Sequence, residues 1–108
     1  MKLNYRILIL SFFIFSNLLA YNPNVETGSI SGKVLDSKQQ PIIGASVVLK
    51  GTVRGVATNE QGEFTLKNVE IGTYMLVVSS LGSQIQEKTV EILRGQTTVI
   101  DFQLAEND

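Results

Sequence analysis

The side chains that could support chemistry in this sequence are carboxylates, amines, amides and hydroxyls, because its 108 residues include no cysteine and no histidine. Without these two residue types there is no thiol nucleophile, no imidazole base, no disulfide framework and no zinc site of the usual kind. Nine basic residues are outnumbered by ten acidic ones and form no runs, so the composition gives no support to nucleic-acid binding. The composition therefore does not reveal a reaction.

Two groups of acidic residues have a spacing that could be functional. Glu87 and Glu91 would face the same side of a strand about 13 Å apart, with no neighbour in the sequence that would make one of them a general acid. Asn59, Glu60 and Glu63 lie near a predicted turn, but they lack the repeated oxygen ligands of a calcium loop. We expect solvated side chains in both places, and we assign no catalytic, metal-binding or cofactor-binding residue and no cofactor.

The first 20 residues have the order of a secretory signal peptide. Lys2 and Arg6 form a basic end without an acid, residues 7–19 form an apolar run, and Ala20 offers a small residue for cleavage. The run is shorter than the roughly 20 apolar residues of a membrane-spanning helix. An uncleaved membrane anchor is the alternative, and a lipid anchor is excluded because no cysteine follows the run. We expect residues 1–20 to be a cleaved signal helix and the protein to be exported.

The rest of the chain has the pattern of short strands separated by turns. Residues 21–27 contain Pro23 and no periodicity, and they predict a linker, whereas apolar and polar residues alternate through residues 28–105. Residues 106–108 are expected to form a tail. The pattern predicts seven strands, over residues 29–35, 45–50, 56–58, 63–66, 73–80, 84–93 and 100–104.

Three local features refine this prediction. Asn59 and Gly62 suit the first and fourth positions of a type I turn, so residues 56–58 and 63–66 are expected to form a hairpin. Residues 73–80 are apolar on both faces, as in a central strand covered on both sides. No segment after residue 20 shows a helical period. The sequence therefore predicts an all-β, antiparallel, seven-stranded β-sandwich formed by residues 28–105.

Lys33 and Asp101, on the first and last predicted strands, are similar to the pairs that form internal amide crosslinks in some bacterial surface sandwiches. Such a link needs a buried, apolar setting. Strand alternation predicts that the Lys33 side chain points outward. It also predicts that the Asp101 side chain points to the opposite face of its strand from Ile100 and Phe102. We therefore predict two ordinary surface charges.

Glycines and apolar residues recur along the chain with a fixed spacing. The positions are Gly32-x-Val34-x-Asp36, Pro41-x-x-Gly44-Ala45-x-Val47-x-Leu49-x-Gly51-Thr52, Gly55-x-x-Thr58-Asn59-x-x-Gly62-x-Phe64-x-Leu66 and Gly72-x-Tyr74-x-Leu76 with Leu81-Gly82. This spacing strongly resembles the carboxypeptidase regulatory-like domain. That domain is a transthyretin-like (prealbumin-like), immunoglobulin-like sandwich found behind metallocarboxypeptidases and at the N-terminus of many TonB-dependent outer-membrane receptors of the SusC type. The resemblance covers about residues 28–104.

The resemblance implies a non-catalytic module, because the family takes its name from enzymes whose catalytic part is a separate zinc domain. It implies a protein partner in the periplasm or in the outer membrane of a Gram-negative bacterium, with the membrane reached only through an attached receptor. A SusC-type receptor would continue into further domains, whereas this sequence ends at Asp108. The expected protein is therefore the truncated or detached N-terminal extension of a nutrient receptor, or a free periplasmic module.

A stand-alone carbohydrate-binding or structural sandwich is the alternative, because similar folds bind glycans. Sugar sites usually present aromatic platforms to the sugar rings. The residues after the predicted leader offer only the aromatic side chains Tyr21, Phe64, Tyr74 and Phe102. The last three are predicted to point inward, so a glycan is the less favoured partner.

Overall fold

The computed structural model describes residues 26–107, and the predicted signal peptide, with residues 21–25 of the predicted linker, lies outside them. Every regular element in this range is a strand. No helix that could cross a membrane is found in it. The strands are β1 (Thr27–Asp36), β2 (Ser46–Leu49), β3 (Gly55–Ala57), β4 (Glu63–Glu70), β5 (Gly72–Ser79), β6 (Gln86–Ile92), β7 (Thr97–Val99) and β8 (Phe102–Leu104).

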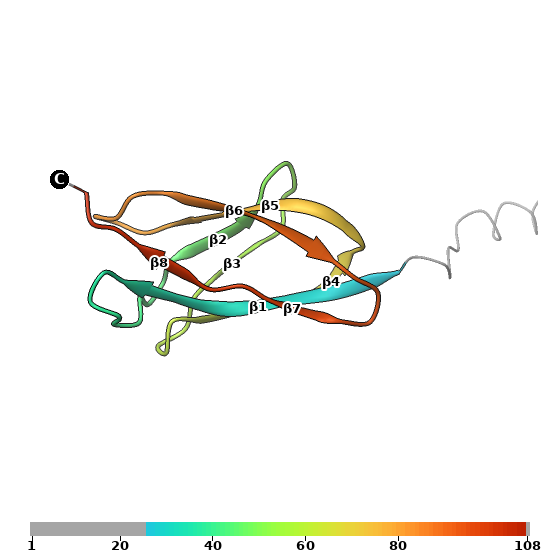
Figure 1. The fold of residues 1–108 in the computed structure, drawn as a ribbon, viewed down its shortest axis with the longest axis horizontal. Helices are drawn as coiled ribbons and strands as arrows, with labels where there is room; N and C mark the ends of the chain where they lie inside the picture. Colours follow the sequence, from blue (N-terminus) through green and yellow to red (C-terminus); the bar gives the residue numbers. More distant parts are fainter. Residues whose placement is uncertain (1–25, 108) are drawn as a thin grey trace, which may run out of the picture.

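The strands form two sheets packed face to face (Figure 1). In one sheet the order is β4-β1-β7, and β8 pairs with β1 beyond the end of β7. In the other the order is β3-β2-β5-β6. The predicted all-β sandwich is confirmed, with the chain entering at one end of the sandwich and leaving at the other (Figure 1).

The core lies between the sheets and follows the alternation of the sequence, since every second side chain of a strand faces the same side. The rings of Phe64 and Phe102 meet in it at a centroid distance of 6.4 Å and an angle of 53°. The core side chains are Ile30, Val34, Ala45, Val47, Leu49, Phe64, Leu66, Val69, Leu76, Val78, Val90, Ile92, Phe102 and Leu104.

Thr58 is the buried polar side chain within residues 26–107. Its Oγ1 accepts a hydrogen bond from the Ala45 N–H at 2.9 Å and donates one to the Ile42 carbonyl at 2.5 Å. Because both functions of the hydroxyl are satisfied, burial leaves no unpaired polar atom there. The threonine of the Gly55-x-x-Thr58 motif therefore fixes the loop that enters β2.

The predicted hairpin of residues 56–58 and 63–66 is wrong. The turn itself forms, because the Gly62 N–H donates to the Asn59 carbonyl at 2.9 Å and Gly62 adopts a φ of 74°. However, β3 pairs with β2, and β4 pairs with β1 in the other sheet. The turn therefore carries the chain across the sandwich, which lets Phe64 enter the core from the opposite layer.

The prediction of a central strand covered on both faces is half right. β5 is central in its sheet, with β2 on one side and β6 on the other. Only Leu76 and Val78 are fully buried along it, whereas Met75 and Val77 lie on the outer face and are half-buried. A two-layer sandwich within the described residues has no third layer to cover that face.

The single strand predicted over residues 100–104 is also corrected. Residues 97–104 form two short strands, β7 and β8, so residues 26–107 contain eight strands and not seven. Both run parallel to β1, whereas the other strand pairs are antiparallel. The break at Ile100 and Asp101 lets the chain follow β1 along nearly its whole length.

Gly32 makes this close approach possible. A Cβ atom at this position would lie 1.8 Å from the Ile100 carbonyl oxygen and 3.0 Å from the Phe64 ring. Real Cβ contacts are never this short, so β1 and the β7–β8 segment would have to separate.

We predict that Gly32→Ala lowers the free energy of unfolding by about 3 kcal/mol, measured by urea denaturation. Ser31→Ala, one residue away, is the control and should change it by less than about 0.5 kcal/mol. Equal effects of the two variants would contradict the close-approach argument.

Gln86 carries a polar atom that the described part of the chain does not satisfy, because its buried Oε1 accepts no hydrogen bond from residues 26–107. Burying such an atom costs free energy that an apolar side chain of the same shape avoids. We predict that Gln86→Met raises the free energy of unfolding by about 1 kcal/mol, measured by urea denaturation. Gln84→Met replaces an exposed glutamine of the same segment and should have no such effect. A loss of stability in Gln86→Met would show that the amide has a partner.

Candidate functional site

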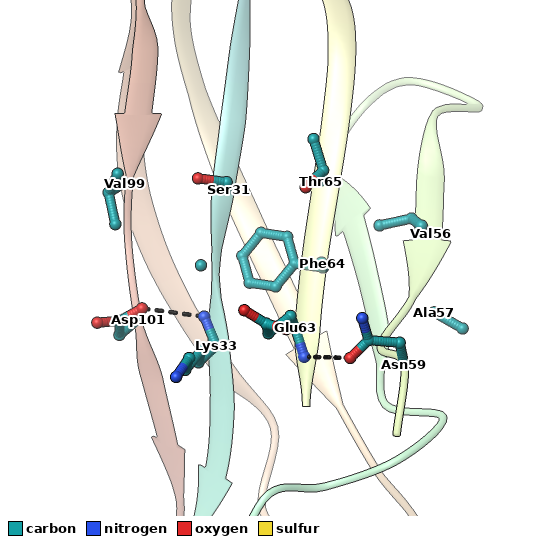
Figure 2. Close-up of a pocket in the computed structure, with 11 residues that line it drawn as sticks. Ser31, Lys33, Val56, Ala57, Asn59, Glu63, Phe64, Thr65, Val99 and Asp101 are labelled. Atoms are coloured by element: carbon teal, nitrogen blue, oxygen red, sulfur yellow. Dashed lines mark hydrogen bonds between the residues drawn. The ribbon is translucent and has the colours of Figure 1, made fainter. Parts of the chain in front are cut away.

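An open groove of about 810 Å³ lies on the outer face of the β4-β1-β7 sheet, bordered by β3. Figure 2 shows its side chains in two rows that cross the strands. Val99, Ser31, Thr65 and Val56 form the upper row, and Asp101, Lys33 and Glu63 lie below them, with Asn59 at the side. The groove is open to solvent along the sheet and does not enclose a small molecule.

The strand register explains why these residues meet. Ser31 pairs with Thr65 of β4 on one side and with Val99 of β7 on the other. Two residues further along β1, Lys33 pairs with Glu63 of β4. Because side chains of directly paired residues stand on the same face, three strands together give one polar surface. In its lower row a single amine lies between two carboxylates.

Asp101 is fixed by the backbone of β1. Its Oδ1 accepts a hydrogen bond from the Lys33 N–H at 2.9 Å, where the ladder between β1 and the last two strands is interrupted (Figure 2). The Asp101 carbonyl in turn accepts from the Lys88 Nζ at 2.6 Å. The Asp101 side chain therefore supplies the acceptor that a regular strand would have supplied from its backbone.

The prediction for Lys33 and Asp101 is correct in part. Both side chains are exposed, as the alternation predicts. The structure brings the two residues together through the Lys33 backbone, so Asp101 is a structural acceptor and more than an ordinary surface charge. Sequence reasoning missed this because the gap between β7 and β8 could not be seen in the alternation.

The structure places the two sets of side chains considered from the sequence at the turn that precedes β4 and on β6. Asn59 Oδ1 accepts from the Gln61 and Glu63 N–H groups at 3.0 and 2.9 Å, so its oxygen is used in closing the turn. Within residues 26–107 no group of three or more acidic residues could hold a metal ion. Glu87 and Glu91 lie exposed on β6, and Glu87 Oε1 is 3.7 Å from the Lys50 Nζ.

The edges of the two sheets are partly closed by side chains. On one side Arg54 donates to the carbonyls of Lys67 at 2.6 Å and Asn68 at 3.1 Å, which lie at the end of β4. On the other side Thr98 Oγ1 donates to the Glu91 carbonyl of β6 at 2.8 Å. A peptide that added a strand to either edge would have to displace these contacts. The outer face is therefore more accessible to a partner than the strand edges are.

One exposed ion pair holds the beginning of β1. Arg94 Nη1 lies 2.6 Å from Glu26 Oε1, and this hydrogen bond and the carboxylate charge raise the pKa of the Arg94 guanidinium. Arginine is already fully protonated at neutral pH, so the pair has a structural effect and adds no acid or base.

These features define an immunoglobulin-like or transthyretin-like sandwich domain with an open polar groove. The chain belongs to the CarboxypepD_reg-like domain family, whose model matches residues 30–108. The family resemblance predicted from the glycine and apolar spacing is therefore confirmed.

A curated relative points to the same family context. The chain is 33% identical over 105 residues to the TonB-dependent receptor SusC of Bacteroides thetaiotaomicron, a match that covers 93% of this chain and 10% of the receptor. The chain thus spans about a tenth of the length of that receptor.

Solved structures share the fold at low sequence identity. A minor pilin of Streptococcus agalactiae superposes with a TM-score of 0.63 at 15% identity, over 78% of this chain and 46% of the pilin. Catechol 1,2-dioxygenase from an Acinetobacter species gives 0.65 at 10% identity, over 81% of this chain and 55% of the enzyme. At these identities the matches establish the fold alone.

The role of the Asp101 carboxylate can be tested directly. We predict that Asp101→Ala lowers the free energy of unfolding by about 1 kcal/mol, because the Lys33 N–H loses its acceptor. Hydrogen exchange of the Lys33 amide should accelerate more than that of other β1 amides. Asp101→Asn keeps an oxygen at the Oδ1 position and should retain most of the protection. Unchanged exchange at Lys33 in Asp101→Ala would contradict this assignment.

Proposed function

We propose that this domain is a non-catalytic, protein-binding module of a TonB-dependent outer-membrane receptor of the SusC type, placed at the receptor's N-terminus and exposed to the periplasm. The observation that carries the proposal is the 33% identity to SusC across 93% of the chain. A module that matches only a tenth of a receptor is expected to act by binding another protein or another part of the receptor. The basic and apolar order of residues 1–20 supports export.

The groove is the surface that we propose for these contacts. It is open, it spans three strands of one sheet and the border of β3, and it mixes polar side chains with the apolar Val56 and Val99. A small-molecule site would be concave and enclosed, whereas protein partners bind broad surfaces with a polar rim. The alternating charges of Asp101, Lys33 and Glu63 would favour a partner of complementary pattern.

The chemistry of the groove supports a role without catalysis. Asp101 Oδ1 is engaged by the Lys33 N–H, and Glu63 is an exposed carboxylate. A general acid–base pair would need two carboxyl groups in different environments aimed at one reacting centre. The residues that line the groove offer no such pair.

Carbohydrate binding gains no support from the aromatic side chains of residues 26–107. Phe64 and Phe102 are buried in the core, and the half-buried Tyr74 donates its hydroxyl to the Glu70 carbonyl at 2.8 Å. A sugar ring would need an exposed aromatic face on which to stack. We therefore do not propose a glycan as the partner.

Site-specific photo-crosslinking in the source bacterium tests the proposal. A photoreactive residue at Thr65 or Val99, both exposed in the groove, should crosslink to a protein recovered with the outer membrane. The same residue at Thr89, exposed on the outer face of the opposite sheet, is the matched control and should give much less product.

Fractionation of the same cells gives a second measurement. The protein should be found in the periplasm or the outer membrane, because the leader directs export. Recovery of the protein from the cytoplasm alone, or equal crosslinking from Thr65 and Thr89, would refute the proposal.

A further inference from the structure

The chain enters and leaves the sandwich through two neighbouring strands that run in the same direction. β1 starts at Thr27 at one end of the sandwich, and β8 finishes at Leu104 near the other end (Figure 1). The register runs from Ser29 opposite Thr97 to Asp36 opposite Leu104. The first and the last strands are therefore in parallel contact along almost all of β1.

This topology determines how the domain responds to tension. A force on the two chain ends pulls β1 toward its N-terminus and β8 toward its C-terminus. Because the strands are parallel and paired, the force acts along them and across their hydrogen bonds, and all bonds share the load. Two strands pulled from the same end would instead separate one bond at a time. We propose that the contact of β1 with β7 and β8 is a mechanical clamp that lets the domain bear tension along its chain.

Hydrogen bonds distributed along β1 form the clamp. Near the start, the Gly95 N–H donates to the Thr27 carbonyl at 3.0 Å, and the Ser29 N–H donates to the Gln96 carbonyl at 2.9 Å. In the middle, the Ile100 N–H donates to the Ser31 carbonyl at 2.9 Å. The Lys33 N–H then donates to Asp101 Oδ1 at 2.9 Å, which bridges the interruption between β7 and β8.

Packing also resists sliding of the strands. Ile30 and Val34 of β1 and Phe102 of β8 are fully buried, so a shift along the strand axis would drag them through a close-packed core. Gly32 adds a steric lock, because the Ile100 carbonyl occupies the place of the missing Cβ. A shift of β1 by one residue would bring Ser31 or Lys33, each with a Cβ, against that carbonyl. The inference depends on the topology of the fold and does not require the proposed function.

Single-molecule force spectroscopy tests the clamp. The chain contains no cysteine, so introduced cysteines are unique attachment points. Asn24→Cys together with a cysteine added after Asp108 pulls the strands in shear. Lys38→Cys, just beyond the end of β1, with the same added cysteine pulls β1 and β8 apart from one end. We expect the mean unfolding force at equal loading rate to be roughly two- to threefold higher in shear, since forced unfolding is set by the barrier that the force meets. Equal forces in the two geometries would overturn the inference.

Two variants separate the clamp from overall stability. Asp101→Ala removes one clamp bond, whereas Val90→Ala makes a core cavity in β6, outside the clamp. Urea denaturation gives the loss of unfolding free energy for each variant. For the same loss of unfolding free energy, the mean unfolding force in shear should fall more in Asp101→Ala than in Val90→Ala. A force that falls in proportion to stability in both variants would show that global stability, and no clamp, sets the resistance.

Discussion

The structure depends on the close contact between β1 and the backbone of Ile100, which Gly32 permits. β1 is the strand that both β4 and the C-terminal strands pair with, so it holds three segments of the chain in one sheet. If the Gly32 contact were lost, the Ser31–Ile100 hydrogen bond and the acceptor position of Asp101 would be lost with it. The burial of Phe102 opposite Phe64 also requires this approach. The absence of a side chain at Gly32 therefore allows the sheet that carries the groove to form.

The elements and most of the core could be predicted from the sequence, because burial of one sheet face leaves a period-two pattern in the residues themselves. In the strands predicted over residues 29–35 and 84–93, Ile30, Val34, Val90 and Ile92 occupy alternate positions, and all four are buried. The glycine and apolar spacing was informative for a different reason. Gly62 is required by its positive φ and Gly32 by the lack of space for a side chain, and both requirements are local and leave a fixed residue in the sequence.

Pairing partners were harder to predict, because they depend on contacts between residues far apart in the chain. Asn59 and Gly62 make the turn that their types indicate, but no local signal shows that β4 then joins β1 instead of β3. The groove arises from the register of Ser31 with both Thr65 and Val99, and the second of these pairs spans most of the domain. Strand alternation correctly indicates that such side chains point outward, yet it cannot tell which of them are neighbours.

The groove and the terminal strand contact involve the same part of the molecule. Ser31, Lys33, Val99 and Asp101 line the groove, and they belong to the segments that connect the two ends of the chain. A partner bound across β7, β1 and β4 would contact both sides of this connection and would bind the paired state more tightly than the separated one. By linkage, a ligand that prefers the native state stabilises it by an amount set by its concentration and affinity. Binding in the groove and resistance to separation of β1 from β8 are thus expected to reinforce each other.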